Sequence, residues 1–254
     1  MIEFKNVSFR YSNFQIQNIS FSVKKGEILA VTGNNASGKT TLIKLISGIL
    51  KTKRGEINLN GKPIKDGAAK VGVVFQNPDN QIIFNKVYDD IAFTLKNNGI
   101  KKEEYDERID YALSLVNMTE YKNAETFTMS SGQKQRIALA NMLAISPDIM
   151  IFDEASAYLD PTNKEALYAM WAELKKRGIT VIFTTNAIEE IVYADRVLVL
   201  NDGQLKADLT TPEMVKNLDI FRELNTFIPL KLKLIEQLNL SSFSDADILA
   251  AIRS

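Results

Sequence analysis

The chain has 254 residues, of which 45% are hydrophobic and 24% charged, so it has enough apolar residues for a sizeable core and is not disordered. Lys plus Arg and Asp plus Glu number 31 each, and this zero net charge gives no sign of a large nucleic-acid-binding surface. The absence of cysteine and histidine excludes disulfides, Cys-ligated metals and Ser-His or Cys-His catalysis.

The first part of the chain is expected to consist of short strands around a glycine-rich loop. Residues 1–25 alternate between apolar and polar, which is typical of β structure. The strand Glu27–Thr32 is apolar enough to be buried on both faces, and helical spacing begins at Thr40. Further short strands are predicted at Ile57–Leu59 and Val71–Phe75.

The rest of the chain alternates helices with short apolar strands, a pattern that predicts a parallel sheet. Residues 86–147 are mainly helical in pattern. The expected elements are the helices Lys101–Val116, Ser131–Ile145, Asn163–Lys176 and Ile188–Tyr193, and the strands Ile149–Phe152, Thr180–Thr184 and Arg196–Leu200.

A small helical module is expected at the C-terminal end. Thr211-Pro212-Glu213 is typical of a helix start, because proline suits the first helical turn. We therefore predict a main domain over residues 1–211 and a helical extension over residues 212–254. No apolar run reaches the roughly 18–20 residues needed to cross a bilayer, and the N-terminus lacks the apolar run of a signal peptide. The protein is expected to be soluble by itself, with any membrane association made through a partner.

The segment after the strand Glu27–Thr32 fits the phosphate-loop pattern G-x-x-x-x-G-K-[ST] at every fixed position. Several backbone N–H groups must meet the phosphate oxygens at once, which requires glycines where a β-carbon would obstruct them. Lys39 would neutralise the β- and γ-phosphates of ATP, and the Thr40 hydroxyl would help to hold Mg²⁺. A chance glycine loop is the alternative, but a buried strand before it and a helix after it favour the nucleotide site. The predicted nucleotide contacts here are Gly33, Asn34, Asn35, Ala36, Ser37, Gly38, Lys39, Thr40 and Thr41.

Two carboxylates follow the apolar strand Ile149–Phe152. Open α/β sheets bind their ligands at the carboxyl ends of parallel strands. Asp153 would support the Mg²⁺ shell, and Glu154 would orient and polarise the attacking water. A solvated acidic turn is the alternative, which the nearby phosphate-loop pattern disfavours.

Three further segments resemble the ATPase domain of ABC transporters. Met129–Arg136 looks like the signature L-S-G-G-Q-x-Q-R, Gln76 with Asn77-Pro78 resembles the Q-loop, and Ala157–Pro161 resembles the D-loop. Their order and spacing match that domain from residue 2 to about 210. The resemblance implies an α/β P-loop NTPase with a RecA-like parallel sheet core, an N-terminal antiparallel β part, a helical signature subdomain and a short C-terminal helical extension.

The same resemblance implies a dimer in which each ATP lies between the phosphate loop of one subunit and the signature segment of the other. Ser130, Gly132 and Gln133 would then face the γ-phosphate bound by the partner. Gln76 would join the nucleotide and its Mg²⁺ to a membrane partner. Tyr11 matches the position whose ring stacks on adenine, although a core or surface tyrosine is the alternative.

A narrower resemblance points to the ATPases of energy-coupling factor transporters, which import vitamins or cobalt and nickel ions into prokaryotic cells. It rests on Val73–Gln81, Val87–Phe93 and the tail segment Phe227–Leu230. It implies an ATP hydrolase coupled to transport, peripheral at the cytoplasmic face of the membrane. The implied partners are a second ABC ATPase, with a heterodimer favoured over a homodimer, an integral membrane coupling subunit and a substrate-binding membrane protein. No nucleic acid is expected, and nothing in the sequence identifies the transported substrate.

The sequence departs from the family at two positions. Asn186 occupies the place of the histidine that follows the strand after the D-loop, and Ser131 replaces the first glycine of the signature. Asparagine donates a hydrogen bond but does not become cationic. We therefore hypothesise that the site with this chain's own phosphate loop binds ATP but hydrolyses it slowly, with Asn186 in a catalytic position. The alternative is that Glu154 suffices and both sites of the dimer turn over.

Other functions remain open at the level of sequence. The chain could serve a different class of ABC transporter, or act as a soluble ABC-type ATPase on ribosomes or in DNA repair. Those soluble proteins usually carry two fused ATPase domains or a long coiled-coil insertion, which this sequence lacks. A nucleotide-binding regulator that does not hydrolyse ATP is the third possibility, and Asn186 keeps it open.

Overall fold

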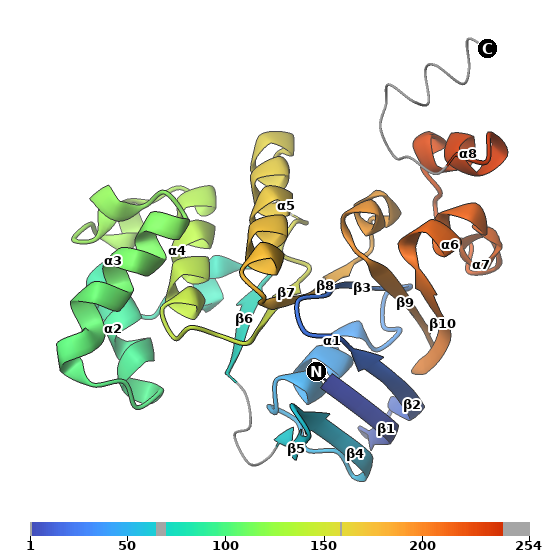
Figure 1. Ribbon diagram of the computed structural model, residues 1–254, viewed down its shortest axis with the longest axis horizontal. Coiled ribbons are helices and arrows are strands. Elements are labelled where there is room, and N and C mark those ends of the chain that lie inside the picture. The colour runs from blue at the N-terminus through green and yellow to red at the C-terminus, as the bar shows by residue number, and fades with distance from the viewer. Residues whose placement is uncertain (1, 65–69, 158, 241–254) are drawn as a thin grey trace. The chain divides into compact units, whose positions relative to one another are not determined.

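The computed structural model describes residues 2–64, 70–157 and 159–240. These residues form two compact units: residues 2–64 and 182–240 belong to the first, and residues 70–157 and 159–181 belong to the second (Figure 1). Tyr158 of the predicted D-loop and residues 241–254 of the predicted extension lie outside the described residues.

The first unit contains a four-stranded antiparallel sheet in the order β2-β1-β4-β5. The central strand β1 pairs antiparallel with both β2 and β4. Phe4 and Phe21 are partners across β1 and β2, and their rings stack with centroids 4.6 Å apart. This confirms the β structure predicted for residues 1–25. The strands are β1 (Ile2–Arg10), β2 (Gln15–Val23), β4 (Arg54–Leu59) and β5 (Lys62–Pro63).

A second set of strands in the first unit has the order β10-β9-β3-β8. β3 (Ile28–Thr32) runs parallel to β9 (Arg196–Asn201), and β10 (Gln204–Thr210) pairs antiparallel with β9. β8 (Thr180–Thr185) begins with two residues of the second unit. β3 is buried throughout, as its apolar sequence predicts. The sequence prediction missed β10, in which no residue is fully buried.

Two short helical segments adjoin these strands. α1 (Lys39–Ile46) begins at the phosphate loop, one residue earlier than predicted. Ile188–Tyr193 was predicted as a helix and forms the 3₁₀ helix η6 instead of an α-helix. Its buried residues Ile188 and Ile191 are three positions apart, which is one turn of a 3₁₀ helix, so this tighter geometry places both on the same side.

Three helices follow β10 in the first unit: α6 (Thr211–Lys216), α7 (Asp219–Glu223) and α8 (Leu230–Gln237). Thr210 and Glu213 form a capping box at the start of α6, so the predicted helix start is confirmed. Figure 1 shows the three helices grouped together at the red end of the described chain. The buried apolar side chains of these helices and their connecting segments are Met214, Val215, Leu218, Phe221, Ile228, Leu232 and Ile235.

The second unit contains the parallel strands β6 (Val71–Phe75) and β7 (Ile149–Asp153) together with four α-helices among its described residues. Across the described ranges, no helix is both long enough and apolar enough to span a membrane. The helices of this unit are α2 (Val87–Asn97), α3 (Tyr105–Leu115), α4 (Ser131–Leu143) and α5 (Pro161–Lys176), and the 3₁₀ turns are η2 (Pro78–Asn80), η3 (Lys102–Glu104), η4 (Thr119–Tyr121) and η5 (Thr126–Thr128).

α5 starts at Pro161, two residues before the predicted start at Asn163. Asp160 is the N-cap residue, and its carboxylate accepts hydrogen bonds from the backbone N–H of Asn163 at 3.0 Å and from its Nδ2 at 2.6 Å. Proline at the first helical position loses no helical hydrogen bond. Asp160-Pro161 of the predicted D-loop therefore also builds the start of a helix.

Asp90 on α2 is a buried carboxylate with three hydrogen-bond donors around it. One oxygen accepts from the backbone N–H groups of Ile83 and Phe84 at 2.8 and 3.0 Å, and the other accepts from Nδ2 of Asn141 on α4 at 2.5 Å. Burial raises the pKa of Asp90, and the three hydrogen bonds oppose this shift. Because the pKa of Asp90 is higher in the folded than in the unfolded state, its contribution to the free energy of unfolding is fully present below the unfolded-state pKa. That contribution is lost as the pH rises through the folded-state pKa.

We predict that Asp90→Ala lowers the free energy of unfolding by roughly 1–3 kcal/mol at pH 7, because it leaves the N–H groups of Ile83 and Phe84 without their acceptor. Asp90→Asn keeps an acceptor there. The amide of Asn141, whose oxygen has no partner among the described residues, then turns to accept from the new amide. Asp90→Asn should lower the free energy of unfolding by less than Asp90→Ala does. It should also make this free energy depend less on pH above the ordinary Asp pKa of 3.8. Urea unfolding at several pH values measures both effects, and equal losses for the two variants would contradict this account.

Candidate nucleotide site

Two glycines set the shape of the phosphate loop in the first unit. Gly33 has φ 144°, and a β-carbon there would lie 2.0 Å from the carbonyl oxygen of Leu200. Gly38 has φ 113°, and a β-carbon there would lie 3.1 Å from the ring of Phe14. Both the dihedral angles and the close neighbours require glycine, so the structure accounts for both fixed glycines of the motif.

The loop presents unsatisfied polar groups. Within the described residues, the backbone N–H groups of Asn35, Ala36 and Gly38 donate to no protein acceptor. The Ser37 hydroxyl is buried, and it too has no partner in the described part of the chain. Gly38 and the Ser37 hydroxyl are buried and need an acceptor from elsewhere, whereas Asn35 and Ala36 are exposed and their N–H groups are accessible to a ligand. A phosphate group, whose oxygens accept several hydrogen bonds, fits this need.

Lys39 is only 5% exposed, and its ammonium group lies inside a set of oxygen acceptors. It donates to the carbonyl oxygens of Gly33 at 2.9 Å and Asn34 at 3.2 Å, and to Oδ1 of Asn186 at 2.8 Å. The loop therefore holds a positive charge beside its free N–H groups before any nucleotide is bound.

Asn186 follows β8 and is exposed. The sequence predicts it as a donor to a phosphate oxygen, and the structure brings its side chain to the phosphate loop. Its oxygen contacts the ammonium of Lys39 at 2.8 Å, so Asn186 acts here as an acceptor. The family's histidine carries an ionisable ring at this position, whereas the amide is neutral at every pH.

Tyr11 and Phe14 lie in the turn between β1 and β2. The N–H of Tyr11 donates to the carbonyl oxygen of Phe14 at 2.8 Å, and the Tyr11 ring packs edge-on against Phe9. Since Phe14 also contacts Gly38, this turn lies against the phosphate loop. The exposed Tyr11 ring is thus near the loop, and adenine stacking stays a prediction. Phe14 was missed, because no spacing in the sequence marks it.

Gly203, in the turn between β9 and β10, also contacts the phosphate loop, and the sequence did not predict this contact. Its N–H donates to the carbonyl oxygen of Ser37 at 3.0 Å, and its carbonyl oxygen accepts from the N–H of Gln17 at 2.9 Å. A β-carbon on Gly203 would lie 1.8 Å from the carbonyl oxygen of Gln15. The turn Asn201–Gly203 therefore holds the phosphate loop against β2.

In the second unit, the predicted Q-loop glutamine and the two carboxylates lie at the ends of adjacent strands. Phe75 on β6 is the register partner of Asp153 on β7, so Gln76 and Glu154 each follow a paired residue. Asp153 is buried. Glu154 has φ 50°, in the left-handed region, so the chain turns sharply directly after β7. The structure thus brings these three side chains to one edge of the strand pair.

The type of ligand atom that the predicted residues offer decides whether they suit Mg²⁺. In the part of the chain that the structure describes, no three His, Cys, Asp or Glu side chains form a metal cluster. The predicted donors Thr40, Gln76 and Asp153 all offer oxygen, which Mg²⁺ prefers, and Mg²⁺ commonly takes its remaining ligands from water and substrate phosphates. The residues present therefore suit an ion bound together with a nucleotide.

The predicted signature segment builds the start of α4. Ser130 caps the helix by accepting from the N–H of Gln133, and Gln133 in turn accepts from the N–H of Ser130 at 2.9 Å. The amide nitrogen of Gln133 also donates to the Tyr121 hydroxyl at 3.0 Å. Ser130 and Ser131 are exposed, and Gly132 is half-buried at this positive helix end. Ser130 and Gln133 thus have structural roles, and their nucleotide contacts stay predictions.

Two contacts hold α4 in place within the second unit. The buried side chain of Gln135 donates to the carbonyl oxygen of Ala155 at 2.5 Å, directly after Glu154. Lys134 pairs with Asp79 at 2.6 Å, close to the Q-loop. The signature helix is therefore linked to the residues that follow both β6 and β7.

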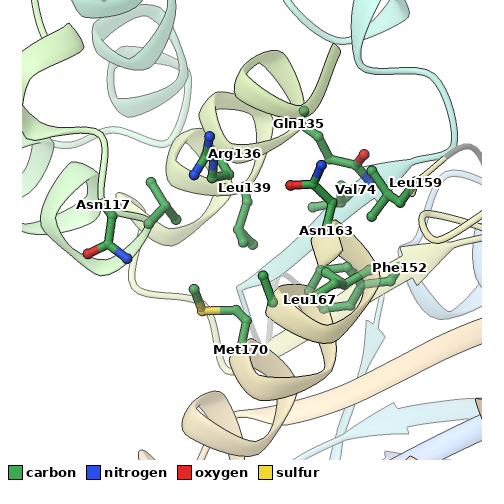
Figure 2. Close-up of a pocket in the computed structure, with 13 residues that line it drawn as sticks. Val74, Asn117, Gln135, Arg136, Leu139, Phe152, Leu159, Asn163, Leu167 and Met170 are labelled. Atoms are coloured by element: carbon green, nitrogen blue, oxygen red, sulfur yellow. The ribbon is translucent and has the colours of Figure 1, made fainter. Parts of the chain in front are cut away.

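A pocket of about 130 Å³ opens between α4 and α5 (Figure 2). Phe152, Leu139 and Leu167 form part of its apolar lining. Figure 2 shows Gln135 and Asn163 facing each other on one side. Gly132 of the signature segment also lines the pocket, so the pocket extends to the start of α4.

The comparisons with known proteins agree with this geometry. Residues 16–157 match the family model described as ABC transporter. The energy-coupling factor transporter ATP-binding protein EcfA1 of Oceanobacillus iheyensis is 41% identical over 238 residues, which cover 90% of this chain and 85% of that protein. EcfA1 of Streptococcus mutans is 39% identical over 254 residues, covering 96% of this chain and 91% of that protein.

Among solved structures, CbiO1 from Clostridium perfringens is similar over 92% of this chain and 98% of its own, with 31% identity and a TM-score of 0.79. It is described as part of the ABC transporter complex CbiONQ. The fold implied by the phosphate loop, Q-loop and signature segment is confirmed. The chain belongs to the ABC transporter family of ATP-binding proteins, and it is similar over most of its length to energy-coupling factor transporter ATP-binding proteins.

Proposed function

We propose that this chain is the ATP-binding and ATP-hydrolysing subunit of an energy-coupling factor importer. The observation that carries the proposal is the phosphate loop, in which the Lys39 ammonium lies beside unpaired backbone N–H groups. The similarity to EcfA1 proteins over most of the chain supports the transporter class.

ATP binding follows from the chemistry of the first unit. The N–H groups of Asn35, Ala36 and Gly38 bind phosphate oxygens, and the positive end of α1 adds to this attraction. Lys39 exchanges its contact with Asn186 for the β- and γ-phosphates. Thr40, Gln76 and Asp153 would hold Mg²⁺, which would supply positive charge against the phosphates.

Hydrolysis needs a group that positions water against the γ-phosphate. Glu154 is proposed for this role because it follows the buried Asp153 at the end of β7, where the backbone turns sharply. Gln76 ends the neighbouring strand, β6, and is proposed to sense the nucleotide on behalf of the membrane partner. Tyr11 is proposed to stack on adenine.

The chain's own site is proposed to turn over slowly. The Asn186 oxygen contacts Lys39 at 2.8 Å, and the amide cannot place a second positive charge on the reacting phosphate. Losing one group that stabilises the transition state commonly costs about 10²-fold in rate. A second ATPase would then provide the faster site, completed in trans by Ser130 of this chain.

The helical extension, residues 212–254, is proposed to pair with that second ATPase in a heterodimer. Phe227 and Leu230 support this, because these large apolar side chains are 80% and 70% exposed. Such side chains are costly to leave in water when they are grouped, and a partner surface would cover them.

An integral membrane coupling subunit is proposed to bind the second unit near the Q-loop. Ile83 is 68% exposed, the Phe84 ring is also exposed, and both follow Gln81 closely. Their backbone N–H groups are fixed by Asp90, so this apolar surface is ordered. The chain would then lie at the cytoplasmic face of the membrane, and a separate membrane protein would recognise a vitamin or a transition-metal ion. No nucleic acid takes part.

Co-purification from detergent-solubilised membranes tests this function. We expect a membrane coupling subunit and a second ATPase to accompany the wild-type chain in fixed stoichiometry. Ile83→Asp should reduce recovery of the membrane subunit at least about 10-fold, because it places a charge in an apolar interface. Ile49→Asp is the matched control, since Ile49 is an exposed isoleucine of the first unit. Equal recovery with both variants would contradict the proposed surface, and a lone wild-type chain would contradict the transporter assignment.

Asn186→His tests whether the chain's own site is slow. We expect ATP turnover by the assembled complex to rise by about 10-fold or more, because the imidazole adds a group able to carry positive charge at the phosphate. Asn186→Ala is the control and should give no increase. Steady-state phosphate release measures both variants. Unchanged turnover for Asn186→His would mean that Asn186 does not limit the rate.

A further inference from the structure

The side chain of Asn34 connects the phosphate loop to the C-terminal helices. Its Nδ2 donates to the carbonyl oxygen of Leu224 at 3.1 Å, although the two residues are 190 positions apart. Its Oδ1 accepts from the hydroxyl of Thr226 at 3.4 Å. Asn34 occupies a variable position of the loop motif, so phosphate binding by backbone groups does not by itself require this amide.

The C-terminal side of this connection is well ordered by local hydrogen bonds. The N–H of Leu224 donates to the carbonyl oxygen of Ile220 at 3.1 Å, and the N–H of Thr226 donates to that of Phe221 at 2.9 Å. Asn225 between them has φ 52°, the left-handed conformation that commonly ends a helix. Phe221 is buried, so the end of α7 is anchored in the core of the helical group.

The end of α7 is in turn joined to α8. Glu236 on α8 accepts from the N–H of Leu218 at 2.9 Å and forms an ion pair with Arg222 on α7. This pairing holds the pKa of Glu236 below its ordinary value. Leu232 and Ile235 of α8 are buried in the same group. A shift of α8 would therefore disturb the segment Leu224–Thr226 that contacts Asn34.

On the loop side, the connection reaches the nucleotide-binding lysine. The carbonyl oxygen of Asn34 accepts from the Lys39 ammonium at 3.2 Å, and the same ammonium donates to Asn186 at 2.8 Å. Asn34 is thus bonded through its backbone to Lys39 and through its side chain to Leu224 and Thr226. ATP binding, which draws Lys39 towards the phosphates, would change the geometry of the hydrogen bonds made by the backbone and by the side chain of Asn34.

We propose that Asn34 and Thr226 are positioning residues that couple ATP binding at the phosphate loop to the C-terminal helices α7 and α8. Coupling of this kind is reciprocal: ATP stabilises the helices as much as the ordered helices favour ATP. The inference rests on the proposed function only in taking ATP as the ligand. It assigns the helical extension a role in setting nucleotide affinity within a single chain.

A double-mutant cycle on the full chain tests the coupling. Asn34→Ala and Thr226→Val should each weaken Mg²⁺-ATP binding about 3–10-fold by calorimetry, the range expected for losing one or two hydrogen bonds. The double variant should be no weaker than Asn34→Ala alone, because both changes remove the same connection. Thr226→Ser should restore wild-type affinity. Asn97→Ala is the matched control, since Asn97 is an exposed asparagine on α2 whose side chain makes no hydrogen bond within the described residues.

Hydrogen exchange separates positioning from a merely structural role. ATP should slow exchange of the α7 and α8 amides, residues 219–237, in the wild-type chain and in Asn97→Ala, but not in Asn34→Ala. If the wild-type chain binds ATP but the affinity losses of the two single variants add in the double variant, the coupling is overturned. It is also overturned if ATP does not slow exchange of these amides in the wild-type chain. Both results leave the proposed function intact. No ATP binding by the wild-type chain, alone or with its partner, would contradict both.

Discussion

The contact between the Lys39 ammonium and three protein oxygens organises the nucleotide-binding half of this molecule. The carbonyl groups of Gly33 and Asn34 and the side chain of Asn186 accept hydrogen bonds from the buried ammonium. In the proposed function, phosphate replaces part of this set. An unpaired buried ammonium would be strongly unfavourable, so the loop must keep its conformation for Lys39 to remain there. On the proposed function, ATP binding is an exchange of the oxygen atoms that accept hydrogen bonds from Lys39.

The loop keeps that conformation because other segments of the first unit approach it closely. Gly33 lies against the backbone of Leu200, and Gly38 lies against the ring of Phe14. Gly203 donates to Ser37, while Asn34 bonds to Leu224. These neighbours come from β9, the first hairpin, the β9–β10 turn and the C-terminal helices. A motif that is local in sequence thus depends on contacts with residues far along the chain.

The local pattern of the sequence predicts much of the fold, because burial and turns leave clear signals. The apolar run of β3, the paired strands β6 and β7, and the capped start of α6 all lie where the residues indicate. β10 was missed because none of its residues is fully buried. The helix predicted at Ile188–Tyr193 is confirmed as η6, but its 3₁₀ type was not predictable because two buried isoleucines three positions apart suit an α-helix and a 3₁₀ helix alike.

The motifs identify the phosphate loop, yet they do not reveal what surrounds it. Neither Phe14 nor Gly203 carries any sequence signal of a nucleotide site. The acceptor role of Asn186 and the amide contacts of Asn34 depend on pairings over 147 and 190 positions, which no spacing rule encodes. These long-range contacts show that the surroundings of the loop depend on the tertiary fold.

The most direct measurement is equilibrium binding of Mg²⁺-ATP to the purified chain with its partner ATPase, comparing wild type with Lys39→Ala and the control Lys44→Ala. Lys44 lies on the same helix as Lys39. We predict that Lys39→Ala weakens binding at this site about 100-fold or more, because charge-assisted bonds to two phosphates are lost, while Lys44→Ala binds like wild type. Equal affinity for wild type and Lys39→Ala, or no binding by wild type, would contradict the account.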